Sequence, residues 1–170
     1  MSRSVMLSIK PKWCELIESG KKTIEIRKTR PKLTPPFKCY IYCTKEGFYG
    51  LKSKTNPAKK TNACGLVIGE FICDEIIEDQ QGEYAIEFSV MGCMPLEQQK
   101  KYAPKAVLYG WHISDLVIYD KPKDLDDFYR FRKCDACESG YESNACIYDD
   151  KCIVPAQLER APQSWCYVDE

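Results

Sequence analysis

The sequence contains no apolar run of about 18 residues, and no basic segment followed by an apolar one opens it. From the first absence we expect no membrane-spanning helix, and from the second we expect no secretory signal peptide. We therefore expect a cytoplasmic protein without membrane contact. Eleven cysteines in such a protein indicate free thiols or metal ligands rather than a disulfide framework.

Histidine is nearly absent, since His112 is the only one in 170 residues. A lone histidine beside a tryptophan, here Trp111, is more often a packing or hydrogen-bonding residue than a catalyst. Because imidazole exchanges protons near neutral pH, His112 is also the natural proton carrier if the protein catalyses a reaction. The sequence leaves both roles open.

Net charge is absent as well, because 25 Lys and Arg balance 25 Asp and Glu. Zero charge by itself disfavours a nucleic-acid partner, yet the two parts of the chain differ sharply. Residues 1–62 hold 15 basic and 4 acidic side chains, a balance of +11, whereas residues 63–170 hold 10 and 21, a balance of −11. Either the two parts interleave in the fold and neutralise each other, or the protein presents a basic face to a polyanion.

A stretch near the N-terminus predicts a strand, a helix and a second strand. Alternating apolar side chains over residues 5–9 indicate a mostly buried strand. A helix follows from Pro11, whose missing N–H is tolerated in a first turn, and it ends at Gly20, where a left-handed stop favours glycine. From Thr23 the period changes to two, which predicts the second strand.

The second strand divides its side chains between two faces. Ile24 and Ile26 face one side, and Glu25 and Arg27 face the other, with Lys22 where the strand begins. One interpretation is an exposed Glu–Arg pair that contributes almost nothing to stability. The other is an anion-facing pocket, in which Lys22 and Arg27 bind phosphate or carboxylate and Glu25 orients the guanidinium or accepts from a base amino group.

The spacing of Gly20, Lys22, Glu25 and Arg27 forms the pattern G-x-K-x-x-E-x-R. This pattern resembles the signature of the ASCH (activating signal cointegrator homology) domains, which are relatives of the PUA RNA-binding fold. The preceding L-S-I-K-x-x-W of residues 7–13 resembles the first strand and helix entry of that family. The resemblance covers residues 4–28 well, and it extends to residues 38–43, 64–75 and 106–119 but not to 123–160.

The resemblance implies an α+β fold, a small PUA-like β-barrel flanked by short helices, in which the motif lines a cleft for nucleic acid or a nucleoside. We expect single-stranded RNA, an extruded base or a nucleotide as the ligand, because proteins read RNA mainly where its bases are splayed. The tryptophans of the cleft would offer a stacking face. The expected ligand-binding residues are Lys10, Lys22, Glu25, Arg27, Trp111, His112 and Trp165.

An enzyme on the same scaffold is the alternative function. One branch of the family consists of small amidohydrolases that remove acetyl from N4-acetylcytidine, and the resemblance places their lysine at Lys22. Their threonine, three residues later, is Glu25 here, which removes the implied nucleophile. A ribonuclease would use Glu25 or His112 as base and Lys22 with Arg27 as phosphate clamp. A third possibility is a protein-interaction adaptor.

The rest of the chain alternates predicted strands with polar connections. Tyr40 and Tyr42 share one face of a strand over residues 37–44, either packed or available to stack on bases. Residues 45–63, with five lysines, Phe48 and Tyr49, indicate either a nucleic-acid contact or a solvated hairpin. Further expectations are strands over residues 64–75, 84–88, 106–119 (bent at Gly110) and 162–168, a solvated turn over 74–83, and a helix over 95–102.

The last motif is a cysteine cluster in a polar stretch. Its C-x-x-C turn places two thiolates side by side, and two further cysteines complete a tetrahedron of sulfurs. Such a polar segment has little to bury, so we expect a structural Zn²⁺ to hold it together. We divide the chain into a barrel domain, residues 1–122 with 160–170, and a zinc-knuckle insertion over 123–159. The expected zinc ligands are Cys134, Cys137, Cys146 and Cys152, with Cys166 as a possible replacement for one of them.

Overall fold

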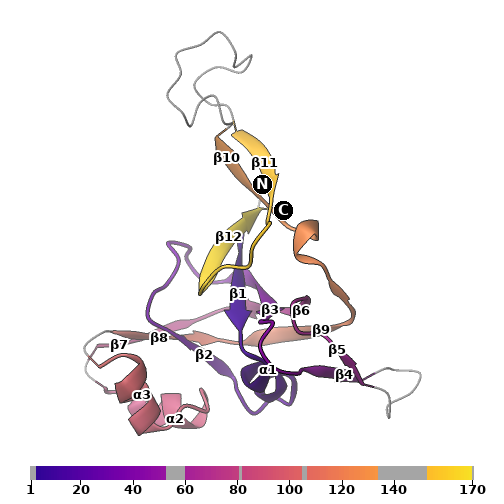
Figure 1. The fold of residues 1–170 in the computed structure, drawn as a ribbon. Coiled ribbons are helices and arrows are strands. Elements are labelled where there is room, and N and C mark those ends of the chain that lie inside the picture. The colour runs from indigo at the N-terminus through magenta and orange to yellow at the C-terminus, as the bar shows by residue number, and fades with distance from the viewer. Residues whose placement is uncertain (1–2, 53–59, 81, 105–106, 134–152, 170) are drawn as a thin grey trace.

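The computed structural model describes residues 3–52, 60–80, 82–104, 107–133 and 153–169. These residues form mostly β-strands with a few short helices (Figure 1). The elements in chain order are β1 (Arg3–Ile9), α1 (Pro11–Glu18), β2 (Ile24–Arg27), β3 (Phe37–Cys43), β4 (Gly50–Lys52), β5 (Lys60–Asn62), β6 (Val67–Cys73), β7 (Ile76–Asp79), α2 (Ala85–Val90), α3 (Leu96–Tyr102), β8 (Leu108–His112), β9 (Ser114–Lys123), a 3₁₀ turn η1 (Leu125–Asp127), β10 (Tyr129–Lys133), β11 (Ile153–Gln157) and β12 (Trp165–Asp169).

The largest sheet has seven strands in the order β11-β10-β12-β1-β3-β6-β9. β1 runs parallel to β3, and the other neighbours are antiparallel. Both faces of its centre are buried. Alternate residues of β1 and β3, such as Leu7 and Ile41, pack with α1, whereas Tyr40 and Tyr42 pack on the other face. The ring of Tyr40 lies 4.8 Å from that of Phe128, which confirms the packing role of this tyrosine.

A second sheet, in the order β2-β8-β7, carries the helices α2 and α3. Its small core joins Ile24 and Ile26 of β2 to Phe88 of α2 and Leu108 of β8. Gly110 makes room for this packing, because a Cβ there would lie 2.7 Å from the Phe88 ring. β2 is thereby packed against α2 on one face of this small sheet.

The predicted barrel is not closed within the described residues. The strands instead form sheets of seven, three and two members, and β9 and β11 lie at opposite edges of the largest one. β8 and β9 connect the two larger sheets directly. Their break falls at Ile113, whose N–H donates to Thr23 O at 2.9 Å, rather than at Gly110. The predicted single strand over 106–119 is therefore two strands in different sheets.

Three predicted elements lie between residues 74 and 102. The helix predicted over 95–102 is confirmed as α3. The strand predicted over 84–88 is wrong: helix α2 covers this region, and the alternation of Ile86 and Phe88 was misleading because only Phe88 is buried. The acidic turn predicted over 74–83 contains β7, which pairs with β8.

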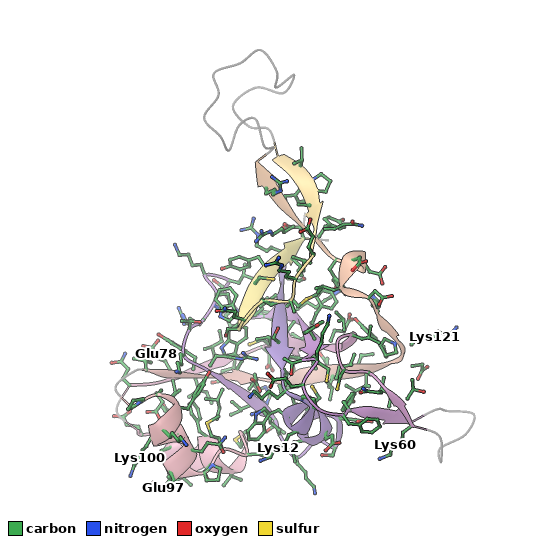
Figure 2. The ribbon with its side chains drawn as sticks, in the orientation of Figure 1. Lys12, Lys60, Glu78, Glu97, Lys100 and Lys121 are labelled. Atoms are coloured by element: carbon green, nitrogen blue, oxygen red, sulfur yellow. The ribbon has the colours of Figure 1, made fainter. Side chains whose placement is uncertain are left out.

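The two parts of the chain with opposite charge interleave in both large sheets. β1 pairs with β12, and β2 pairs with β8. One result is an ion pair between Arg3 Nε and Asp169 Oδ1 at 3.4 Å. Acidic and basic side chains also occur on the same element, as Glu97 and Lys100 do on α3 (Figure 2). The charge split of the sequence is therefore not a split of the molecule into two bodies.

The predicted insertion contributes two strands to the largest sheet. β10 and β11 form an antiparallel hairpin, and β10 also pairs with β12 at Tyr129 and Asp169. In Figure 1 this hairpin and the three helices lie at opposite ends of the molecule. The domain boundaries at 122 and 160 stay a prediction. The helices among the described residues are all too short to cross a membrane.

Candidate functional site

The G-x-K-x-x-E-x-R stretch forms the turn after α1 and the strand β2. Gly20 has φ +71°, the left-handed conformation expected of a helix stop. The Lys22 N–H then donates to Leu16 O at 3.0 Å, which folds the chain back along the helix. The strand continues through Ile24–Arg27, antiparallel to β8. The local structure therefore follows the sequence pattern closely.

Lys22, Glu25 and Arg27 form a buried ion triad, and each residue is less than 10% exposed. Lys22 Nζ lies 3.3 Å from Glu25 Oε2, and Arg27 Nε lies 3.0 Å from Glu25 Oε1. Two positive charges thus share one negative charge. The motif is therefore not the exposed Glu–Arg pair of the first interpretation. Because water screens charges weakly at such a buried site, these ion pairs are stronger than pairs on the surface.

The two cations of the triad have further partners on distant segments. Lys22 Nζ donates to Gly92 O at 2.7 Å, and it lies 5.1 Å from the centre of the Trp13 ring. The Arg27 guanidinium donates to Ser8 O at 2.7 Å and to the carbonyl and hydroxyl of Ser164, both at 3.2 Å. The triad thereby joins β2 to β1, to the residues after α2 and to those before β12.

The triad forms part of the wall of a cleft of about 370 Å³. Lys10 is at the exposed part of this wall, with its side chain 69% accessible and its Nζ 3.8 Å from Glu46 Oε2. The structure therefore brings together four of the predicted ligand-binding residues. The complete lining is Ser8, Ile9, Lys10, Trp13, Lys22, Glu25, Ile26, Arg27, Thr44, Met94, Gln98, Tyr102 and Gln163.

Three buried polar atoms of the cleft lining form no hydrogen bond within the described part of the chain. Glu25 Oε2 and Arg27 Nε have their ion-pair contacts within the triad, and the third atom is Thr44 Oγ1. Because buried polar atoms are normally satisfied in folded proteins, Thr44 Oγ1 marks a position in the cleft where a ligand or water can complete the bonding. Its hydroxyl can either donate or accept a hydrogen bond.

Three predicted ligand-binding residues lie away from the cleft. Trp111 is fully buried in the main core, so it has no exposed face for stacking. Trp165 packs against it at 6.0 Å, and its Nε1 donates to Thr29 Oγ1 at 2.9 Å. His112 Nδ1 lies 2.6 Å from Asp74 Oδ1, and this hydrogen bond lowers the pKa of the Asp74 carboxyl.

Several lining residues had no signal in the sequence. Gln98 and Tyr102 come from α3, which we predicted only as a polar helix. Gln163 comes from the segment before β12, and Thr44 follows the end of β3. Trp13 belongs to the segment that resembles the ASCH family, but its position beside Lys22 Nζ comes from the structure.

The basic stretch over 45–63 contains the hairpin of β4 and β5. Tyr49 belongs to the core, and its hydroxyl donates to Glu18 Oε2 at 2.8 Å, so it is not available for stacking. Phe48 is 55% exposed and Lys60 is exposed, so these two side chains remain accessible to a partner.

The four predicted zinc ligands, Cys134, Cys137, Cys146 and Cys152, lie outside the described residues. Within the described ranges, His, Cys, Asp and Glu form no cluster of three that could hold a metal ion. Cys166 is on β12, half-buried near Arg130; burial raises the pKa of its thiol, and the guanidinium opposes this rise.

Comparisons with known proteins agree on one family. The sequence model of a family described as the ASCH domain matches residues 7–130. The crystal structure of the ASCH protein from Zymomonas mobilis is 16% identical, with a TM-score of 0.62, and the alignment covers 98% of this chain and 88% of that one. The crystal structure of a mutant of the same protein is 15% identical, with a TM-score of 0.63, and the alignment covers 98% of this chain and 89% of that one. These identities establish the fold alone. Among curated proteins, a search found no match.

Proposed function

Because this chain belongs to the ASCH domain family, we propose that it binds RNA or a nucleotide in the cleft beside the Lys22–Glu25–Arg27 triad. The observation that carries the proposal is the cleft itself. Three basic side chains and a single acidic one line it, together with the Thr44 hydroxyl, which lacks a hydrogen-bond partner within the described residues. Such a lining favours an anionic ligand that also has a group able to hydrogen-bond with a hydroxyl.

The dimensions of the cleft favour a single nucleotide unit over a duplex. A volume of about 370 Å³ is at the low end of small-molecule sites, which span roughly 300–1,000 Å³. An unstacked base from a single strand, or a free nucleotide, therefore fits the proposal better than a paired helix. Trp13 and Tyr102 supply aromatic groups in the lining, and Gln98 and Gln163 supply amides.

Each cation has a different role in this proposal. Lys10 is accessible and can meet a phosphate from solution. Lys22 and Arg27 are already paired with Glu25, so they act as a fixed positive wall that needs no reorganisation when the ligand enters. A hydrolase gains no support from this arrangement, because Glu25 is held between two cations and replaces the threonine of the related amidohydrolases.

The experiment is a salt-titrated binding assay with short single-stranded RNA. Lys10→Ala leaves the buried triad intact, so the variant should fold normally while losing one phosphate contact. We expect affinity to fall about 5-fold and the slope of log K against log salt to flatten by about 0.7. Fluorescence anisotropy at salt concentrations from about 50 to about 300 mM would measure the affinity and its salt dependence, because phosphate contacts weaken over roughly this range.

Lys121→Ala is the matched control, since this lysine is exposed on β9, outside the cleft lining (Figure 2). It should change neither affinity nor slope. Equal weakening by Lys10→Ala and Lys121→Ala would show diffuse electrostatic binding and contradict the cleft. An absence of salt-sensitive binding at low salt would contradict an RNA strand as the ligand.

We also propose that Cys134, Cys137, Cys146 and Cys152 hold a structural Zn²⁺. The C-x-x-C spacing and the polar composition of this stretch support the proposal. So does the β10–β11 hairpin, which places Lys133 opposite Ile153 and so brings the two flanks of the stretch together. Such an ion would hold the stretch together and has no role in the cleft.

Metal analysis of protein purified without added metal should find about one zinc per chain. Cys146→Ser should lose it, whereas Cys166→Ser should retain it if the four cysteines of the motif are the ligands. Loss of zinc in Cys166→Ser instead would identify Cys166 as a ligand. Metal-free wild-type protein that is fully folded would refute the site.

A further inference from the structure

Three cysteine thiols meet behind the cleft, where β3 ends and β6 approaches. Cys43 Sγ lies 3.9 Å from Cys64 Sγ. Cys14, on α1, adds a third thiol, since it hydrogen-bonds with Cys43 and also donates to Ile9 O at 3.6 Å. This cluster has no role in the binding site described above, although its neighbours Ile9 and Thr44 line the cleft.

The thiols of the cluster differ in exposure and acidity. Cys14 and Cys43 are fully buried, whereas Cys64 is partly accessible to solvent. The hydrogen bond from Cys14 lowers the pKa of Cys43, with a second contribution from Cys64, and together these outweigh its burial. Burial, together with the neighbouring Cys43, raises the pKa of Cys64. A buried thiol that favours its thiolate thus lies beside a thiol that solutes can reach.

The backbone holds Cys43 and Cys64 next to each other. Cys43 N–H donates to Leu66 O at 2.9 Å, and Gly65 N–H donates to Cys43 O at 2.7 Å. The N–H of Cys64 is in turn held by Asn62 Oδ1 at 3.1 Å. The two sulfurs therefore need only a small side-chain movement to pass from 3.9 Å to the roughly 2.05 Å of a disulfide bond.

We propose that Cys43 and Cys64 form an oxidation site that closes to a disulfide with a hydroperoxide as the oxidant. The accessible Cys64 sulfur, on losing its proton, attacks one peroxide oxygen, the O–O bond breaks with release of hydroxide, and Cys64 becomes a sulfenic acid. The Cys43 thiolate then attacks Cys64 Sγ, which forms the S–S bond and expels hydroxide. With hydrogen peroxide, two thiols lose two electrons and two protons, and the products are one disulfide and two water molecules.

The disulfide would close the loop that contains β4 and β5, residues 44–63. This segment carries Lys60 and the exposed Phe48, and its Tyr49 side chain is part of the main core. Cross-linking its two ends restricts the unfolded chain more than the folded one, so oxidation should stabilise the protein. The proposal is independent of RNA binding, and neither result decides the other.

The test treats fully reduced protein with hydrogen peroxide and maps its cross-links by tryptic digestion and tandem mass spectrometry. Cleavage after Lys45 and Lys60 places Cys43 and Cys64 on different peptides, and fragment ions separate Cys43 from Cys39 and Cys64 from Cys73. We expect a Cys43–Cys64 link and a melting temperature several degrees higher, both reversed by dithiothreitol.

Cys64→Ser should abolish both the link and the thermal shift. Cys93→Ser is the matched control, because Cys93 is also partly accessible and lies on the same tryptic peptide as Cys64. It should leave both effects unchanged. A Cys64 that ends as sulfinic acid without a link, a link to Cys39 or Cys73 instead, or a thermal shift that survives Cys64→Ser would each overturn the proposal.

Discussion

Replacing Glu25 by glutamine is expected to lower the free energy of unfolding by about 3–5 kcal/mol. The carboxylate lies within ion-pair distance of both Lys22 and Arg27, and all three residues are buried. Glutamine keeps the shape and removes the negative charge, so two cations remain at close range with little water to screen them. Urea-induced unfolding of wild type and variant would measure the difference.

Glu46→Gln provides the matched control, because Glu46 pairs with Lys10 at 3.8 Å on the surface. That change should cost less than about 1 kcal/mol. Adding Lys22→Met to Glu25→Gln should recover part of the lost stability, since it removes one of the unpaired cations. A loss for Glu25→Gln no larger than that for Glu46→Gln would contradict the buried triad.

Replacing Gly69 by alanine is expected to cost about 3 kcal/mol, because the added methyl has no space. A Cβ at this position would lie 2.3 Å from the carbonyl oxygen of Val117 and 3.2 Å from the Cα of Ile118. Both atoms belong to the backbone of β9, which pairs with β6 at this point. The strands must therefore separate, and thermal or urea unfolding would report the loss.

Gly82→Asn is the control for this substitution. Gly82 also has a positive φ of 82°, but its Cβ position meets nothing within 4 Å. Asparagine tolerates the left-handed conformation, so this larger addition should cost less than about 1 kcal/mol. If Gly69→Ala proved as mild as Gly82→Asn, the close approach of β6 and β9 would be contradicted.

The strand–helix–strand unit at the N-terminus was predictable because its signals are local. Alternation marked β1, Pro11 and Gly20 marked the two ends of the α1 region, and the change of period marked β2. The same reasoning failed over residues 84–88. Apolar residues two apart also occur on a helix of which only one side is buried, and α2 buries Phe88 while Ile86 stays exposed.

The candidate site was only partly predictable for a related reason. Lys22, Glu25 and Arg27 lie within six residues of each other, so the motif itself revealed them as a group. Gln98 and Tyr102 reach the same cleft from α3, and Gln163 reaches it from the segment before β12. These arrangements depend on how the second sheet packs, and no pattern in the sequence encodes that directly.

The sequence by itself determined the local unit, the charged motif and the family of this protein, because periodicity and short-range spacing carry all three. The tertiary structure alone decided that the triad is buried, that Trp111 belongs to the core, and that the oppositely charged parts interleave. It also decided that Cys43 and Cys64, 21 positions apart, are neighbours. The physical reason is that burial and close contact arise from pairings between distant strands, such as β1 with β12 and β2 with β8.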